Sequence, residues 1–101
     1  DDCSHLKELT IKSFEILFPL LKSGGYYCIE DTVAPAYWSS WGGDSSIFDS
    51  KFMQYFFNLC HYINLKRQET FNPPQSIKIP DWIKQIDSIH FHYSQIIVKK
   101  K

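Results

Sequence analysis

Two short acidic segments are the parts of this sequence best suited to chemistry. One, DDCSH, opens the chain, and the other, EDT, directly follows a short apolar run. Carboxylate oxygens are the ligands that Mg²⁺ prefers, and a histidine with an ordinary pKa of about 6.5 can accept a proton near neutral pH. Asp2, Glu30 and Asp31, with His5 alongside as a base, therefore predict a divalent-cation site that activates a hydroxyl group.

The same side chains also have ordinary structural uses. Asp1 and Asp2 could favour the amino end of a following helix by offsetting its dipole, and the later acids could be turn residues.

His90 and His92 lie two positions apart on one strand face, a spacing that metal ligands can have. Their alternation is nevertheless more typical of a solvent-facing strand surface.

A helix followed by a strand must position the second acidic segment. Residues 6–21 have helical spacing. Their apolar positions are Leu6, Leu9, Phe14, Leu17, Leu20 and Leu21, with Ile11 and Phe18 on a flanking stripe. Ser4 can cap this helix, Pro19 disturbs its last turn, and Gly24-Gly25 ends it. Residues 26–29 are predicted to be a strand buried on both faces, of the kind found in parallel sheets. The acids then stand at the carboxyl end of the strand, where open α/β sheets bind ligands.

The remainder of the chain predicts a loop, a second helix and a hairpin. Residues 32–50 indicate a long loop whose rings Tyr37, Trp38 and Trp41 favour a lid or pocket wall. Asp49 or Ser50 can cap a helix that fades near residue 66, and proline-rich residues 70–80 form a connector. Residues 88–93 and 96–98 alternate like two strands joined by a turn at Ser94-Gln95.

This order of elements predicts one partial α/β domain over residues 1–101, with aromatic-rich surface left open. We expect either a homo-oligomer or a missing N-terminal half to cover that surface. The formal net charge is zero, so we expect no nucleic-acid partner, and the basic run Lys99–Lys101 is predicted to be a solvated terminus. Three cysteines without a CxxC pair indicate reduced thiols and a cytoplasmic location, and no apolar run is long enough to span a membrane.

Three stretches of sequence resemble a known family. They are DDxSH at the start, SFExLFPxLKxGGYYxIEDT at residues 13–32 with a Tyr-Trp pair beyond it, and IxSIHFHYSQIIVKK at residues 86–100. Together they resemble the carboxyl half of the metal-dependent, S-adenosylmethionine-using O-methyltransferases of macrolide sugars, the mycinamicin and tylosin type. The resemblance implies the C-terminal half of a Rossmann-like methyltransferase sheet, ordered helix, strand, long loop, helix and β hairpin.

The resemblance implies a role for each matched position. The implied Mg²⁺ ligands are Asp2, Glu30 and Asp31. His5 matches the general base, and Asp1 matches an acid near S-adenosylmethionine. Trp38 matches an aromatic residue on the acceptor side of the pocket, and we expect its neighbour Tyr37 to bind substrate with it. The chain departs from the pattern at Cys3, where the family has glycine, and at His61, where it often has aspartate.

The sequence therefore predicts an S-adenosylmethionine-dependent, Mg²⁺-assisted O-methyltransferase acting on a hydroxyl of a sugar or polyketide-like small molecule. The glycine-rich cofactor loop is absent, so we expect this chain to be inactive alone. Two alternatives stay open. A non-catalytic remnant or interaction module predicts no divalent-ion binding, whereas an Fe(II) oxygenase using His90, His92 and a carboxylate predicts loss of iron binding on His90→Ala.

Overall fold

The computed structural model of this chain describes residues 6–44, 46–65 and 79–101. The helices are α1 (Lys7–Leu17), α2 (Val33–Tyr37), α3 (Lys51–Leu65) and α4 (Asp81–Lys84), and the 3₁₀ turns are η1 (Phe18–Leu20), η2 (Ser39–Trp41) and η3 (Ile47–Asp49). The strands are β1 (Tyr26–Glu30), β2 (Ile86–His92) and β3 (Gln95–Lys100). The three strands form one antiparallel sheet in the order β1-β3-β2. This arrangement confirms the predicted α/β class and the order helix, strand, helix and hairpin.

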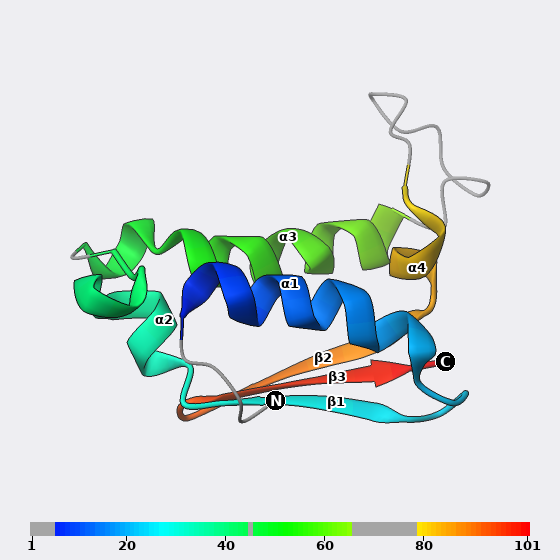
Figure 1. The fold of residues 1–101 in the computed structure, drawn as a ribbon. Coiled ribbons are helices and arrows are strands. Elements are labelled where there is room, and N and C mark those ends of the chain that lie inside the picture. Colours follow the sequence, from blue (N-terminus) through cyan, green and yellow to red (C-terminus); the bar gives the residue numbers. More distant parts are fainter. Residues whose placement is uncertain (1–5, 45, 66–78) are drawn as a thin grey trace.

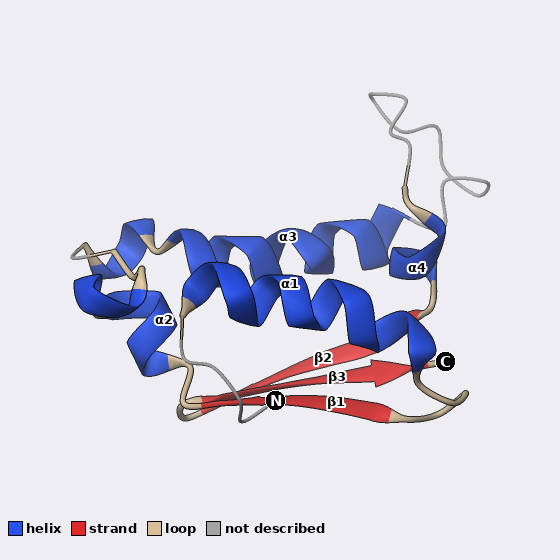
Figure 2. Ribbon diagram, viewed as in Figure 1, coloured by secondary structure: helices blue, strands red, loops and turns tan. Residues whose placement is uncertain are grey.

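The described residues form two layers (Figure 1). Helices α1 and α3 lie on one face of the sheet, whereas α2 and α4 lie at opposite ends of the molecule. Figure 2 shows the same division by type, with every helix on one side of the three strands. None of the helices in these residues is both long and apolar enough to span a membrane.

Aromatic side chains dominate the core between the two layers. Phe14 of α1 is fully buried, and its ring centroid lies 5.3 Å from that of Tyr27 in β1 and 5.5 Å from that of Phe56 in α3. Trp82 of α4 approaches the same ring at 5.8 Å. One side chain therefore joins the sheet to three helices, and rings in edge-on or tilted contact stabilise that junction beyond their area burial.

The buried face of α1 differs from the predicted leucine stripe. Thr10, Phe14 and Phe18 are the fully buried positions, spaced by four residues along α1 and η1. Most of the predicted stripe is exposed, and Leu20 keeps 76% of its surface accessible. The prediction was wrong because two overlapping stripes have helical spacing, and the larger aromatic rings take the face that meets the sheet and α3. As predicted, Pro19 converts the last turn of this helix into a 3₁₀ turn.

Strand β1 lies where the sequence predicted a strand, but its pairing was predicted wrongly. It pairs antiparallel with β3 and has one buried face, carrying Tyr27 and Ile29, while Tyr26 and Glu30 at its ends are exposed. The prediction was wrong because Tyr26 has an apolar ring. It therefore extended the apolar run, although in the structure Tyr26 is on the exposed face of the strand. Within the described residues, helices cover the sheet on one face only.

Residues 32–50 are not the single long loop that the sequence predicted. They contain α2, η2 and η3. Pro35 sits in the first turn of α2, where its missing N–H leaves no hydrogen bond unmade. Further on, the Met53 N–H donates to the Ser50 hydroxyl at 3.3 Å, which confirms Ser50 as a cap of α3. The predicted connector at residues 70–80 lies mostly outside the described residues, as does the predicted Ser4 cap.

The hairpin was predicted well, whereas the basic tail was not. Ile89 and Phe91 face one side of β2 and His90 and His92 the other, as the alternation indicated. Lys100, however, is part of β3, and its ammonium group donates to the carbonyl oxygens of Pro19 at 2.8 Å and Leu21 at 2.7 Å. This side chain satisfies backbone acceptors at the end of the first helix and is not a solvated terminus.

We therefore expect Lys100→Met to lower the free energy of unfolding by about 1.5–3 kcal/mol, the usual worth of hydrogen bonds to a charged group. Urea denaturation would measure the change. Lys99→Met is the matched control, because the Lys99 ammonium lies 4.0 Å from a half-exposed Asp87 carboxylate and such pairs contribute at most about 1 kcal/mol. Equal losses for the two variants would contradict the proposed anchoring role.

Candidate functional site

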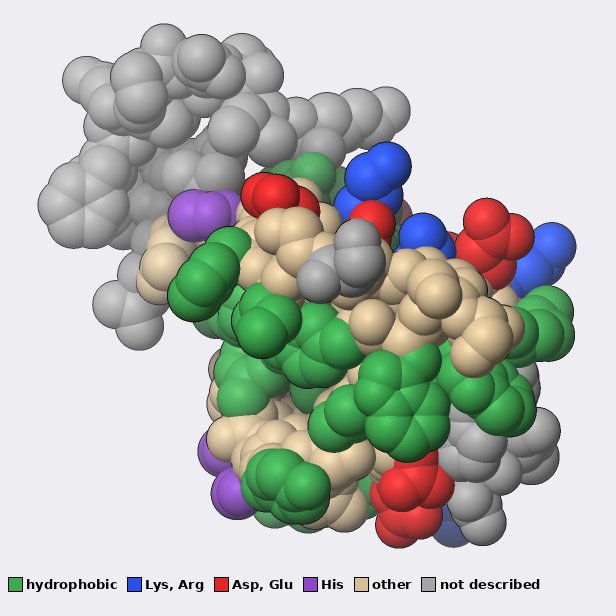
Figure 3. Space-filling model, turned by 90° about the vertical axis from the view of Figure 1, so that its left-hand side faces the viewer, with side chains coloured by type: hydrophobic (Ala, Val, Ile, Leu, Met, Phe, Trp, Pro, Cys, Tyr) green, Lys and Arg blue, Asp and Glu red, His purple; other side chains and the backbone are tan. Residues whose placement is uncertain are grey.

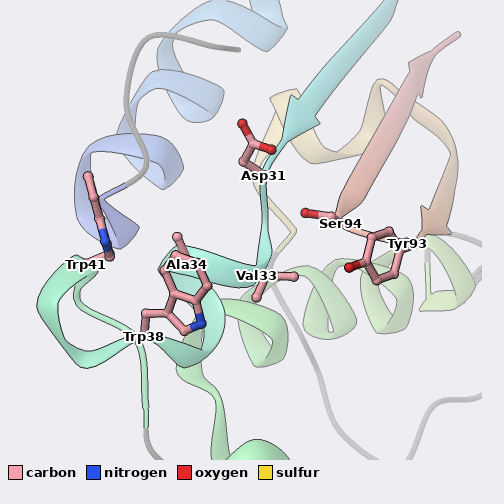
Figure 4. A pocket seen from close by; sticks show the side chains of 7 residues that line it. All are labelled: Asp31, Val33, Ala34, Trp38, Trp41, Tyr93 and Ser94. Carbon is pink, nitrogen blue, oxygen red and sulfur yellow. The ribbon is translucent and has the colours of Figure 1, made fainter.

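A pocket of about 440 Å³ opens at the carboxyl end of β1. Its lining residues are Asp31, Val33, Ala34, Trp38, Trp41, Tyr93 and Ser94. Figure 4 shows Trp38 and Trp41 on one side of it, Tyr93 and Ser94 on the other, and Asp31 where the strand ends. Such a concave site with aromatic walls and a few polar groups is typical of small-molecule binding.

Strand pairing brings the two sides of the pocket together. In the register between β1 and β3, Glu30 is opposite Gln95, so the hairpin turn stands beside the end of β1. The Thr32 N–H donates to the Ser94 carbonyl oxygen at 3.3 Å and ties the two turns together. Asp31 and Ser94 both have a positive φ, of 54° and 52°, a conformation that aspartate tolerates better than most residues.

The tryptophan side of the pocket depends on a tight backbone contact between η2 and α2. The Gly43 N–H donates to the Trp38 carbonyl oxygen at 2.9 Å, and the Asp44 N–H donates to the Ala36 carbonyl oxygen at 3.2 Å. Gly42, at φ 85°, ends η2 and lies against Lys7 at the start of α1. The wall is thereby fixed to both α2 and the amino end of α1.

The structure brings together part of the site that the sequence predicted. Asp31 and Trp38 line the same pocket, and Glu30 is exposed beside it at the end of β1. Tyr37 is half-buried and packs against the core, so it is not among the lining residues. The predicted residues Asp1, Asp2 and His5, together with Cys3, lie outside the described residues.

Sequence reasoning missed the hairpin side of the pocket. Tyr93 and Ser94 were read only as the end of a strand and a turn, and Val33 and Ala34 only as loop residues. The usable signal was the turn between β2 and β3. If β3 pairs with β1, this turn must lie at one end of β1. Nothing in the local pattern, however, indicated which strand β1 would pair with.

Ionisable side chains elsewhere in the molecule have structural explanations. Burial, followed by the nearby charge of Glu15, raises the pKa of the Tyr55 hydroxyl well above its ordinary value of 10.0. Burial likewise raises the pKa of the Cys60 thiol, which contacts the Phe56 carbonyl oxygen at 3.7 Å. Neither group is therefore suited to acid, base or nucleophilic chemistry near neutral pH.

The described residues fit part of an oxygen-ligated cation site. Glu30 and Asp31 are adjacent carboxylates, and the pocket lining contains one acid and no lysine, arginine or histidine. Carboxylate oxygens are ligands that hard cations such as Mg²⁺ prefer, and the lining offers no ligand for a soft metal. Within residues 6–44, 46–65 and 79–101, no three histidine, cysteine or acidic side chains come close enough to hold a metal, and His90 instead lies 3.0 Å from the Ser88 hydroxyl.

Hydrophobic side chains surround the pocket on the molecular surface. Figure 3 looks at the end of the molecule that carries α2 and shows these side chains gathered there. Five large exposed hydrophobic residues belong to this region, because they follow α2, lie in η2 or η3, or form the hairpin turn. They are Trp38, Trp41, Ile47, Phe48 and Tyr93. An apolar surface with one acidic edge is suited to an amphipathic ligand.

Comparisons with known proteins point to O-methyltransferases. The chain is 47% identical over 45 residues to L-olivosyl-oleandolide 3-O-methyltransferase of Streptomyces antibioticus and 51% identical over 45 residues to demethylmacrocin O-methyltransferase of Streptomyces fradiae. Those matches cover 45% of this chain and 11% of each relative. No protein-family profile matches the chain.

Solved structures show the same relationship over nearly the whole chain. MycE methyltransferase of the mycinamycin biosynthetic pathway, in complex with Mg and SAH, matches with a TM-score of 0.79 and 27% identity over 99% of this chain. A second complex, which also holds mycinamycin VI, matches with a TM-score of 0.77 and 28% identity. This chain spans about a quarter of those structures, 25% and 24% of their length. In sequence and fold, the chain is therefore related to one part of the S-adenosylmethionine- and Mg-dependent O-methyltransferases of the macrolide-sugar type.

Proposed function

We propose that this chain is part of an enzyme that methylates a hydroxyl group of a sugar or polyketide-like small molecule, using S-adenosylmethionine and Mg²⁺. One observation carries the proposal: Asp31 and Trp38 line a single pocket, with Glu30 beside it, in a fold shared with a methyltransferase solved with Mg, SAH and a macrolide. The two acids and the tryptophan are the residues that the family resemblance assigns to metal and acceptor.

The two acidic segments and the pocket wall would together hold and orient the acceptor. Glu30 and Asp31, joined by Asp2, would hold Mg²⁺ through carboxylate oxygens, and Trp38 would exclude water from the acceptor side of the pocket. Mg²⁺, when bound, lowers the pKa of a coordinated hydroxyl and fixes its direction. His5 would take the hydroxyl proton on a ring nitrogen. The acceptor oxygen would then bond the methyl carbon as the carbon–sulfur bond of the sulfonium breaks and its electron pair stays on sulfur.

The methyl donor needs residues that this chain does not supply. The four glycines form two pairs: Gly24-Gly25 precedes a strand, and Gly42-Gly43 follows a 3₁₀ turn. Neither pair joins the end of a strand to the start of a helix, which is how glycine-rich turns hold a cofactor. Asp1 is proposed to lie on the donor side, and the rest of such an enzyme would complete the donor site. We accordingly expect no methyl transfer by the 101-residue chain alone.

Cation binding tests the proposal directly. We expect Mn²⁺, a paramagnetic substitute for Mg²⁺, to broaden the amide signals of Thr32 and Ser94 first in a nuclear magnetic resonance titration of the full chain. Asp31→Asn should weaken this effect at least about ten-fold, because losing a carboxylate beside a dication costs more than the 1.4 kcal/mol that a factor of ten represents.

A matched control is Asp81→Asn, whose carboxylate is 98% exposed on α4 at the opposite end of the molecule. This variant should keep the wild-type titration. His90→Ala should also keep it, in contrast to the iron-site alternative. Identical broadening in wild type and Asp31→Asn would refute the proposed ligand set. The absence of broadening in the wild type would favour the non-catalytic remnant, which predicts no divalent-ion binding.

A further inference from the structure

We infer that Tyr93 determines acceptor specificity, its ring forming the wall that stacks on the saturated ring of a sugar opposite Trp38 and Trp41. The inference rests on the proposed function, since it concerns the acceptor side of the same pocket. Neither the matched sequence motifs nor the predicted metal site assigns Tyr93 a role.

The first argument is that Tyr93 has no structural task. Its side chain is 95% exposed, at the turn between β2 and β3. Among the ring–ring contacts of the described residues, none involves Tyr93, although the neighbouring Phe91 packs on Phe57 at 5.2 Å. A large ring held in water at a tight turn contributes little to folding, whereas tyrosine offers rigid, amphipathic contact area to a ligand at low entropic cost.

The second argument is that the turn is fixed in place relative to the acidic edge. The Thr32 N–H bonds the Ser94 carbonyl oxygen at 3.3 Å, and the pairing of Glu30 with Gln95 anchors the strand on the other side. The backbone at Tyr93 is therefore held at a set position relative to Asp31, beside the pocket. Figure 4 shows its ring across the pocket from Trp38, with Val33 between them.

The third argument is chemical and points to a sugar ring. The pocket combines aromatic walls with a carboxylate, Asp31, and a hydroxyl, Ser94, on one edge. A pyranose has apolar C–H faces and hydroxyl groups at its rim, so its faces can lie against Tyr93 and Trp38 while its rim meets the polar edge. A hydrocarbon ligand, by contrast, would cover the Asp31 carboxylate without offering it a hydrogen bond.

The experiment is a titration of the Mg²⁺-loaded full chain with mycinamycin VI, followed through the indole N–H signals of its three tryptophans. Signals of Trp38 and Trp41 should shift, whereas that of Trp82 should stay, because Trp82 packs on Phe14 at the far end of the molecule. Tyr93→Ala should weaken binding about ten-fold, as expected for truncating an aromatic contact at the centre of a site. Tyr93→Phe should retain binding within about three-fold, because the ring carries the contact.

Tyr26→Ala is the matched control, since Tyr26 is also an exposed tyrosine (57%) but lies at the amino end of β1 and does not line the pocket. Its binding should equal that of the wild type. Equal binding by wild type and Tyr93→Ala, with the Mn²⁺ response intact, overturns the role of Tyr93 and leaves the proposed function standing. A loss in Tyr93→Phe as large as in Tyr93→Ala also overturns it, because the hydroxyl would then carry the contact. No shift at Trp38 or Trp41 in the wild type also overturns the role of Tyr93, whereas only loss of the Asp31-dependent Mn²⁺ response overturns the proposed function.

Discussion

Replacing Phe14 with alanine is expected to lower the free energy of unfolding by about 3–5 kcal/mol, the usual cost of removing a buried phenylalanine ring. The side chain is fully buried, and its ring centroid lies within 5.8 Å of those of Tyr27, Phe56 and Trp82. The variant would leave a cavity where the sheet meets three helices, with no single neighbour able to fill it. A domain of this size has a total stability of only about 5–15 kcal/mol, so urea denaturation should show a large shift of the midpoint.

Phe57→Ala removes the same ring from a different environment and serves as the control. Phe57 is 45% exposed, and among the rings of the described residues it contacts only that of Phe91, so we expect a loss of no more than about 1.5 kcal/mol. Because both variants remove a phenylalanine ring, the difference between their losses of stability measures the effect of burial. A Phe14→Ala variant no less stable than Phe57→Ala would show that the junction of α1, β1 and α3 is not the centre of the core.

Local sequence pattern predicted α1, β1, α3 and the hairpin, but not the buried face of α1 or the strand that pairs with β1. Helical spacing located α1 and α3, and Pro19 marked the change to a 3₁₀ turn, because these features depend on neighbouring residues alone. Whether the leucines or Phe18 would be buried beside Phe14 depended on what lies opposite the helix. That information resides in the packing of α3 and the sheet, which no window of the sequence contains.

The same limit explains what was found of the site and what was missed. Asp31 could be predicted because a strand end followed by acids is a local pattern, and Trp38 because it stands a few residues beyond. Tyr93 could not, since it reaches the pocket only through the antiparallel pairing of β1 with β3, two strands far apart in sequence. The role of Lys100 could not be predicted for a related reason. Its ammonium group binds the carbonyl oxygens of Pro19 and Leu21, which are brought close only by the fold.

We expect Gly43→Ala, which adds one methyl group, to destabilise the pocket wall more than any other addition of a single methyl group. A Cβ at Gly43 would lie 2.6 Å from the backbone nitrogens of Tyr37 and Trp38 and 2.8 Å from the Ala36 carbonyl carbon. All three neighbours are backbone atoms, so no side-chain rotation relieves the clash. The segment after η2 must instead move away from α2 and give up the hydrogen bond from the Gly43 N–H to the Trp38 carbonyl oxygen. Overpacking and the lost hydrogen bond together should cost about 2–4 kcal/mol.

The indole signals of Trp38 and Trp41 distinguish this clash from a general loss of stability. Both should shift in Gly43→Ala, while that of Trp82, at the other end of the core, should not. Gly24→Ala is the control: its backbone has φ +80°, but an added Cβ meets nothing within 4 Å. That variant should lose only the roughly 1–2 kcal/mol of a left-handed alanine and leave the pocket tryptophans unchanged. If Gly43→Ala unfolds more readily yet keeps both indole signals in place, the strain is absorbed within residues 42–44. The tryptophan wall would then be held by contacts other than the close approach of Gly43 to α2.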